Sequence, residues 1–250
     1  MLGDLPQVEA LGPQIVDIGE RGGLPWRYFG HLYLGLAAHR RGNAERAEAE
    51  LRKALELEPP GAFAGQSAAA LAQHLASDGR IHDVMELFKS AQSNLPSLNR
   101  VNGVGSWTCM LNFVEALCLC GMHQEAAALA PLVERALEVL GTTYFPYDGR
   151  LVETRAGLAA AAARRWDEAE RHFGIAREVA AQISNRVELA DISRLHARML
   201  LDRDGTGDHE RAAEMLQEAL SAYRTFGMPS YVAEAERLQR QAHDFSGPPP

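Results

Sequence analysis

The stretch GNAERAEAELRKALELEP, residues 42–59, contains the pattern that decides the fold. Gly42 is followed by Ala47 five residues later, by Leu51 after four more and by Ala54 after three more. The spacing of Ala47, Leu51 and Ala54 predicts a helix with one apolar face. A glycine just before such a helix indicates a turn, because glycine adopts left-handed backbone angles without steric cost.

The same spacing recurs four more times along the chain, starting at Gly79, Gly121, Arg164 and Gly207. The apolar positions of these units are Val84, Phe88 and Ala91; Ala126, Ala130 and Val133; Ala169, Phe173 and Ala176; and Ala212, Leu216 and Ala219. A second apolar helix pattern precedes each turn. Each unit therefore predicts a helical hairpin, with small residues where its two helices cross. The fifth unit fits only if its turn contains three extra residues.

Together these units resemble the tetratricopeptide repeat, over about residues 26–226. The resemblance implies an all-α fold, a right-handed superhelical solenoid of about five hairpins with flanking helices. The expected hairpins span residues 26–59, 62–96, 106–140, 149–183 and 187–226. Residues 1–25 are expected to form a helix or partial repeat, residues 229–241 a capping helix, and residues 242–250 a disordered tail.

A narrower resemblance involves YDGRLVETRAGLAAAAARRWDEAERHF (147–173) and HARMLLDRDGTGDHERAAEMLQEALSAYRTFGMP (196–229). These segments resemble the C-terminal tetratricopeptide arm of bacterial signalling proteins that carry an adenylate or guanylate cyclase domain or a signal-transduction ATPase module. The resemblance implies a scaffold or sensor arm whose partner is a cyclase or ATPase signalling module. This chain contains neither of those catalytic segments.

Composition and charge narrow the function classes. The chain has 250 residues, 46% of them hydrophobic, and a formal net charge of −8. A net negative charge repels nucleic acid, so we expect no nucleic-acid partner. No run of about 18 apolar residues predicts a membrane span. The start lacks the basic region of a secretory leader, and the three cysteines are an odd number, so we expect a cytoplasmic protein.

The acidic stretch DRDGTGD, residues 202–208, raises the alternatives of a calcium loop and a turn. Its glycine directly follows the second acid, and no glutamate lies where a calcium loop needs a bidentate ligand. The stretch also falls where the other units have their turn. We therefore interpret it as a lengthened turn, with Asp208 as the N-cap or first-turn acid of the next helix.

Motifs for catalysis or cofactor binding are absent from the sequence. No two of the nine histidines lie three or four residues apart, as a zinc pair on one helix requires. The sequence also lacks a nucleophile elbow, a phosphate-binding loop and a dinucleotide fingerprint. We therefore expect no enzyme, no cofactor and no metal.

The concave face of a stack of hairpins is the expected functional site. The first helix of each unit lines this groove, and in the family the groove often holds a partner peptide. The expected partner-binding residues are Phe29, His39, Gln66, Gln73, Thr108, Glu115, Arg155, Arg194 and Arg198, with Thr154 and Asp191 among the further lining positions. The arginines suit a carboxylate or an acidic segment. The alternative is a receptor that binds a small-molecule inducer in the same groove.

Overall fold

The computed structural model describes residues 4–22, 26–99, 101–140 and 149–244, and these residues are helical without any β-strand. The predicted all-α class is thus confirmed for this part of the chain. No helix within it is long and apolar enough to cross a bilayer.

The thirteen α-helices of the described residues are α1 (Leu5–Gly22), α2 (Arg27–Arg40), α3 (Ala44–Leu57), α4 (Gln66–Ser77), α5 (Ile81–Ser90), α6 (Val104–Leu119), α7 (His123–Ala128), α8 (Ala130–Leu140), α9 (Val152–Ala162), α10 (Trp166–Gln182), α11 (Arg186–Arg203), α12 (Asp208–Phe226) and α13 (Pro229–Asp244). A short 3-10 helix, η1 (Gln92–Asn94), follows α5.

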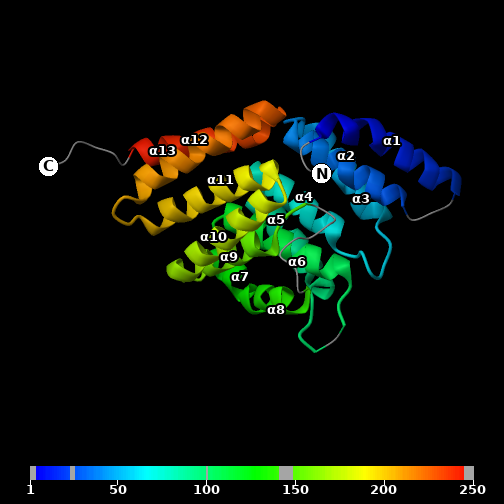
Figure 1. Cartoon of the computed structure of the whole chain (residues 1–250). Helices are drawn as coiled ribbons and strands as arrows, with labels where there is room; N and C mark the ends of the chain where they lie inside the picture. The colour runs from blue at the N-terminus through cyan, green and yellow to red at the C-terminus, as the bar shows by residue number, and fades with distance from the viewer. Residues whose placement is uncertain (1–3, 23–25, 100, 141–148, 245–250) are drawn as a thin grey trace.

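Consecutive helices pack in pairs, and the pairs pack in series. α2 packs on α3, α4 on α5, α9 on α10 and α11 on α12, while α6 packs on both α7 and α8. The first helices of neighbouring pairs also contact one another, α4 against α6, α6 against α9 and α9 against α11. Helix α1 covers the outer side of α2. Figure 1 shows the resulting row of helices, which curves from the blue N-terminal end to the red C-terminal end.

The turns inside the first four pairs share one hydrogen-bonding pattern. The residue after the turn position donates its N–H to the carbonyl five residues earlier, at 2.9 Å in each case: Asn43 to Ala38, Arg80 to Leu75, Met122 to Leu117 and Arg165 to Ala160. A hydrogen bond of this kind is typical of a helix whose C-terminus is followed by a residue in the left-handed conformation. Gly42, Gly79 and Gly121 have that left-handed conformation, and so does Arg164, with φ +57°.

The repeated apolar positions are buried in all five units. Ala47, Leu51 and Ala54 are 0% exposed. The corresponding residues of the other units are each exposed by less than a tenth of their surface: Val84, Phe88, Ala91, Ala126, Ala130, Val133, Ala169, Phe173, Ala176, Ala212, Leu216 and Ala219. The sequence pattern therefore marks equivalent places in the structure.

Two of the small residues that precede the turns let helices approach closely. A Cβ atom on Gly35 would lie 2.6 Å from Cγ of Leu51, across the α2–α3 crossing. At the equivalent position of the fourth unit, a Cβ atom on Gly157 would lie 3.0 Å from the ring of Phe173. Larger side chains at these sites would separate the helices.

Three details differ from the predicted arrangement. The second helix of the third unit is divided into α7 and α8, because Pro131 has no N–H to donate and its ring clashes with the preceding turn. The fifth turn spans residues 204–207, one residue more than the others, and the remaining extra length lies in α11. Helix α13 runs to Asp244, so residues 242–244 are helical, while residues 245–250 lie outside the described residues.

The acid-rich stretch forms the turn between α11 and α12. Asp204 ends α11 in a left-handed conformation, and Asp208 is the first residue of α12. The Asp208 carboxylate accepts hydrogen bonds from the Arg203 guanidinium, at 2.6 and 2.7 Å, and from the Gly205 N–H at 2.9 Å. Its oxygens thus stabilise the turn itself.

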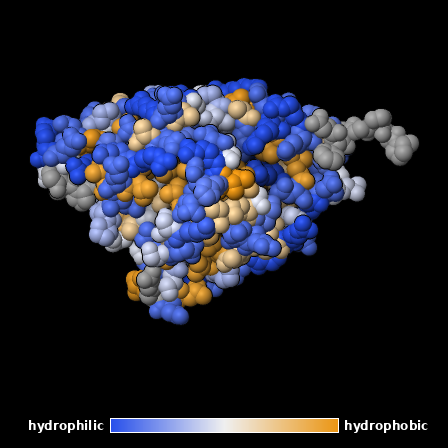
Figure 2. Space-filling model, turned by 180° about the vertical axis from the view of Figure 1, so that it is seen from behind, coloured by the Kyte–Doolittle hydropathy of each residue, from blue (hydrophilic) through white to orange (hydrophobic). Residues whose placement is uncertain are grey.

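The last helix of the chain returns to the first pair. Ser230 on α13 donates a hydrogen bond to the carbonyl oxygen of His39 on α2, at 2.6 Å. Arg41, just after α2, donates to the carbonyl oxygen of Gly227, at 3.1 Å. In Figure 1 the start of α13 accordingly lies beside the end of α2. Figure 2 shows the opposite face of the molecule, hydrophilic over most of its area, with hydrophobic residues gathered in its middle and lower part.

The close α2–α3 crossing gives a test of the packing. We expect Gly35→Ala to lower the free energy of unfolding by about 1–3 kcal/mol, because the new methyl group overlaps Leu51 in a filled core. Gly174→Ala on α10 is the matched control, since nothing lies within 4 Å of its added Cβ. The control should gain roughly 0.5–1 kcal/mol from helix propensity. Urea unfolding measures both, and equal effects would refute the crossing geometry.

Candidate functional site

Three of the predicted groove residues lie together on α2, α4 and α6. Gln66 accepts a hydrogen bond from the Tyr28 hydroxyl and donates one to the Thr108 hydroxyl, both at 3.4 Å. Phe29 packs edge-on against the ring of Phe63, with centroids 5.2 Å apart. The side chains of Phe29, Gln66 and Thr108 are buried. Their contacts therefore join the first three helix pairs inside the structure.

Glu115 on α6 forms the centre of a second and larger group. Its side chain is 3% exposed and accepts hydrogen bonds from Arg150 and Arg155. Arg194 lies 3.4 Å from its second oxygen, and Gln73 on α4 donates to it at 3.1 Å. One carboxylate therefore connects α4, α6, α9 and α11. We call the charged residues around it the inner charge cluster; it comprises Glu115, Arg150, Arg155, Glu188, Asp191, Arg194 and Glu234.

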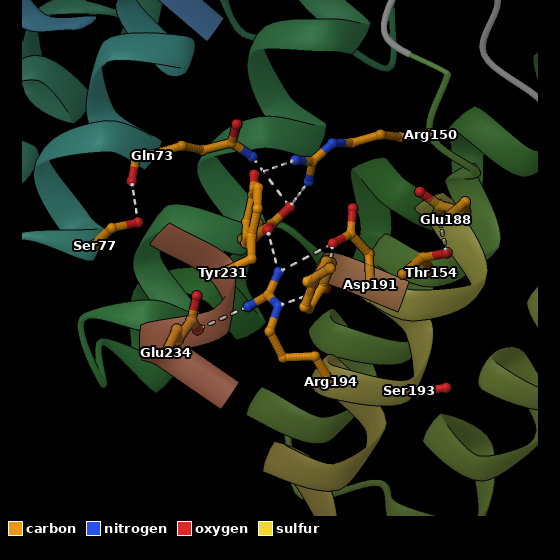
Figure 3. Close-up of polar contacts among 12 residues, drawn as sticks. Gln73, Ser77, Arg150, Thr154, Glu188, Asp191, Ser193, Arg194, Tyr231 and Glu234 are labelled. Carbon is orange, nitrogen blue, oxygen red and sulfur yellow. Dashed lines mark hydrogen bonds and ion pairs between the residues drawn. The ribbon is translucent and has the colours of Figure 1, made fainter. Parts of the chain in front are cut away.

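Arg194 extends the cluster to the last two helices. Its guanidinium donates to Glu234 on α13 at 2.7 Å and to the Tyr223 hydroxyl on α12 at 3.2 Å. The Tyr223 hydroxyl in turn donates to Asp191 at 2.6 Å. The ring of Tyr231 lies 5.2 Å from the guanidinium carbon. Figure 3 shows Arg194 reaching from α11 between Glu234 and Asp191.

Glu188 ties α11 to the start of α9. Asn185 caps α11 by accepting the Glu188 N–H at 3.2 Å, which fixes the first turn. The Glu188 carboxylate then accepts the Thr154 hydroxyl at 2.6 Å and the Leu151 N–H at 3.0 Å. Arg155 lies 3.5 Å from the same oxygen. Burial raises the pKa of Glu188, and Arg155 opposes that change.

The cluster keeps its charges because they compensate one another. Burial alone would raise the pKa of Glu115, but Arg150, Arg155 and Arg194 outweigh it and lower the pKa to about 2. Glu115 is therefore ionised at neutral pH. A buried ion costs several kcal/mol unless partners surround it, so each member of the cluster depends on the others.

His39 lies where α2 meets α13. Its Nδ1 is 3.2 Å from Nδ1 of His74, and its ring packs edge-on against Tyr231 with centroids 5.6 Å apart. Burial, followed by the neighbouring His74 and Arg40, lowers the pKa of His39 to about 3. The imidazole is therefore neutral at neutral pH.

Eight of the nine predicted partner-binding residues are less than a tenth exposed: Phe29, His39, Gln66, Gln73, Thr108, Glu115, Arg155 and Arg194. Their side chains contact one another or neighbouring side chains inside the stack, and His39, Gln66 and Thr108 also border pockets. Partner binding by these residues stays a prediction. In this conformation, their polar groups contact the protein's own side chains.

Arg198, the ninth residue, is more exposed than the other eight and borders a separate pocket. Its side chain is 18% exposed and donates to the Leu119 carbonyl at 3.1 Å. Its Nη1 lies 3.9 Å from Glu234 and has no hydrogen-bond partner among the described residues.

The pocket beside Arg198 has a volume of about 130 Å³. We call it the groove pocket; its lining residues are Cys118, His123, Leu158, Ala161, Ala162, Arg164, Trp166, Leu195, Arg198, Met199 and Asp202. They come from α6, α9 and α11, the first helices of three pairs, together with α7 and α10. The walls are mainly apolar. Burial raises the pKa of Asp202, while Arg198 and His123 oppose that change.

Sequence reasoning missed five residues of these groups: Arg150, Glu188, Tyr223, Tyr231 and Glu234. Arg150 stands in a connection, and Glu188 looks like an ordinary acid in the first turn of a helix. The side chains of Tyr231 and Glu234 belong to the helix expected only to cap the stack. The one available signal was the Asn185–Glu188 spacing, which is that of a capping box.

The histidines, cysteines and acids give no metal site among the residues that the structure describes. No three His, Cys, Asp or Glu side chains in this part of the chain are placed to hold a metal. Burial raises the pKa of the Cys109, Cys118 and Cys120 thiols. These thiols are thus less reactive than free cysteine at neutral pH.

Removing the central carboxylate tests the inner charge cluster. We expect Glu115→Gln to lower the free energy of unfolding by about 3–5 kcal/mol, because it leaves buried arginines uncompensated. The matched control is Glu138→Gln, in an exposed ion pair with Arg135, which should change stability by less than about 1 kcal/mol. Chemical denaturation measures both, and a small effect of Glu115→Gln would contradict the charge balance described here.

Because His39 is neutral in the folded chain, we expect the folded state to lose stability in acid. Its pKa is about 3 in the folded chain, below the ordinary value of 6.5, so below pH 6.5 the unfolded chain binds a proton that the folded chain does not. Stability should therefore fall as the pH drops from about 6.5 towards 3. We expect His39→Gln to flatten this decrease, measured by denaturant unfolding at several pH values. The exposed His82→Gln should leave it unchanged, and an unaltered slope in His39→Gln would count against the assignment.

Comparisons with protein-family models, with curated proteins and with solved structures found no match for this chain.

Proposed function

We propose that the chain is a non-catalytic protein-interaction module that binds a segment of a partner protein. In this proposal the helices form a right-handed superhelical solenoid of five tetratricopeptide-like hairpins. Its support is the equivalence of the five units, each with a left-handed turn position followed by three buried positions at the same spacing. Stacked repeats of this kind present extended binding surfaces.

The groove pocket is the observation that carries the proposal. It lies where the first helices of three successive units meet, which is the concave side of a stack. A cavity of about 150 Å³ accommodates a benzene ring, so the groove pocket, at about 130 Å³, matches one apolar side chain of a partner. Its apolar walls, including Leu158, Trp166 and Met199, suit such an anchor.

Arg198 provides a hydrogen-bond donor next to that apolar side chain. The part of its guanidinium that is exposed at the pocket can donate to a carbonyl or carboxylate of the bound segment. His123 and Asp202 stand at the same pocket and offer further hydrogen bonds to a peptide backbone. The partner is therefore a segment with an apolar side chain followed or preceded by an acceptor group.

Because of the inner charge cluster, we place the binding site at the groove pocket and not at the centre of the groove. Arg155 and Arg194 are 1% and 0% exposed and are paired with Glu115. A partner that used them would have to displace α13 and compensate several buried charges. Binding at the groove pocket requires neither change.

A small-molecule receptor remains the second candidate. The pocket's volume is well below the roughly 300–1,000 Å³ of typical small-molecule sites. A side chain anchored there therefore fits better than a whole inducer. The cyclase or ATPase signalling module implied by the resemblance stays a prediction about the partner.

Filling the pocket tests the proposal. A peptide-display library selected on the wild-type chain should yield binders that share one apolar residue beside an acidic or amide residue. We expect Ala161→Leu, which fills the pocket, and Arg198→Gln, which removes the donor, each to weaken these binders at least about tenfold, a loss of about 1.4 kcal/mol. Fluorescence polarisation with the selected peptides measures the affinities.

The exposed Ala181→Leu on α10 adds the same volume outside the pocket and should bind the selected peptides like the wild type. Circular dichroism verifies that all variants stay helical. Equal binding by Ala161→Leu, Arg198→Gln and the wild type would place the peptide site elsewhere. Selection of no peptide, together with saturable binding of a metabolite lost in Ala161→Leu, would favour the receptor.

A further inference from the structure

A second concave site lies where α13 meets the first two pairs. This seam crevice has a volume of about 560 Å³ and is separate from the groove pocket. Its walls come from the α2–α3 turn, the C-terminal end of α4 and one face of α13. The residues that give it its chemistry are Arg41, His74, Asp78, Glu234, Arg237 and Arg240.

Positive charge predominates in the seam crevice. Arg237 and Arg240 are exposed and form no ion pair or hydrogen bond with any residue that the structure describes. Arg41 is fixed at the opposite wall by its bonds to Glu9, at 3.3 Å, and to the Gly227 carbonyl, at 3.1 Å. Three guanidinium groups thus surround one space, and two of them have no partner.

The carboxylates at the crevice do not cancel this charge. Glu234 is paired with Arg194 in the inner charge cluster, at 2.7 Å. Asp78 remains, with a side chain that is 43% exposed. Arg41 is likewise paired with Glu9, so one carboxylate outside the inner charge cluster faces two unpaired arginines and one paired arginine.

Backbone groups add to the positive potential. Helix α3 begins at Ala44 and helix α13 at Pro229, and both residues line the crevice. The first N–H groups of a helix have no partner within it, and the helix dipole is positive at that end. Two helix N-termini and three guanidinium groups form a typical environment for a phosphate group.

His74 forms a buried part of the crevice wall. His74 is 2% exposed, and its Nε2 has no hydrogen bond among the described residues, with Asp78 3.8 Å away. Its Nδ1 is engaged with His39. Asp78 and the Ala44 backbone are its nearby polar groups, so the arginines, and not His74, provide the donors that face the open space of the crevice.

We propose that the seam crevice binds an oxyanion, the phosphate group of a small organic phosphate, between Arg41 on one wall and Arg237 and Arg240 on the other. Such a ligand would contact both ends of the helical stack at once. Its binding would stabilise the contact between α13 and the first pair. This inference does not depend on the groove pocket or on a partner peptide.

The test titrates the full chain by calorimetry with inorganic phosphate and with glucose 6-phosphate, at constant ionic strength. We expect saturable binding of at least one probe and a rise in Tm with its concentration. The double variant Arg237→Gln/Arg240→Gln should weaken binding at least tenfold. Tighter binding of the ester than of the inorganic ion would identify an organic phosphate, and equal binding would identify the free ion.

The matched control is Arg21→Gln/Arg135→Gln, which removes two positive charges from exposed arginines outside the crevice. It should bind the probes like the wild type. Both double variants alter exposed side chains, so both should fold, as circular dichroism can verify. The proposal is overturned if the wild type binds neither probe saturably, or if the two double variants lose affinity equally.

Discussion

The requirement to compensate buried charge determines how the whole chain is arranged. Glu115 is ionised inside the stack, and the three arginines around it reach it from two parts of the sequence, the start of α9 and the middle of α11. An ion in this position is tolerated only when its partners are in place. The pairs that contain α4, α6, α9 and α11 must therefore stack in one register, and α13 must supply Glu234 to Arg194.

Interactions between residues close in sequence form the helical hairpins that the inner charge cluster joins. A left-handed residue ends the first helix of each unit, and three buried positions place the second helix on it. Small residues such as Gly35 set how closely the two helices approach. None of these local features fixes the curvature of the row. The hydrogen bonds of Arg41 and Ser230 are contacts of a different kind, because they join α2 to the start of α13 at the other end of the row.

The sequence predicted the helices well because helical periodicity and turn chemistry are local. Even the unit with Arg164 in place of glycine could be aligned, since its apolar spacing was intact. The burial of Arg155 and Arg194 could not be predicted from such local patterns. The burial of Arg194 depends on Tyr223, Tyr231 and Glu234, which lie dozens of residues away and meet it only after the chain has folded. Arg155 depends in the same way on Glu115 and Glu188. Glu188 was missed for the same reason, because its partners Leu151 and Thr154 belong to the preceding unit.

A closed inner face with binding sites at its edges rests on the attachment of α13 to the inner charge cluster. A double-mutant cycle between Arg194 and Glu234, with Arg194→Met and Glu234→Gln and unfolding in urea as the readout, measures that attachment most directly. We predict that the two changes are coupled by at least about 1 kcal/mol, as expected for buried residues in one ionic network. Additive effects would mean that α13 does not compensate the buried charge, and would contradict the closed inner face.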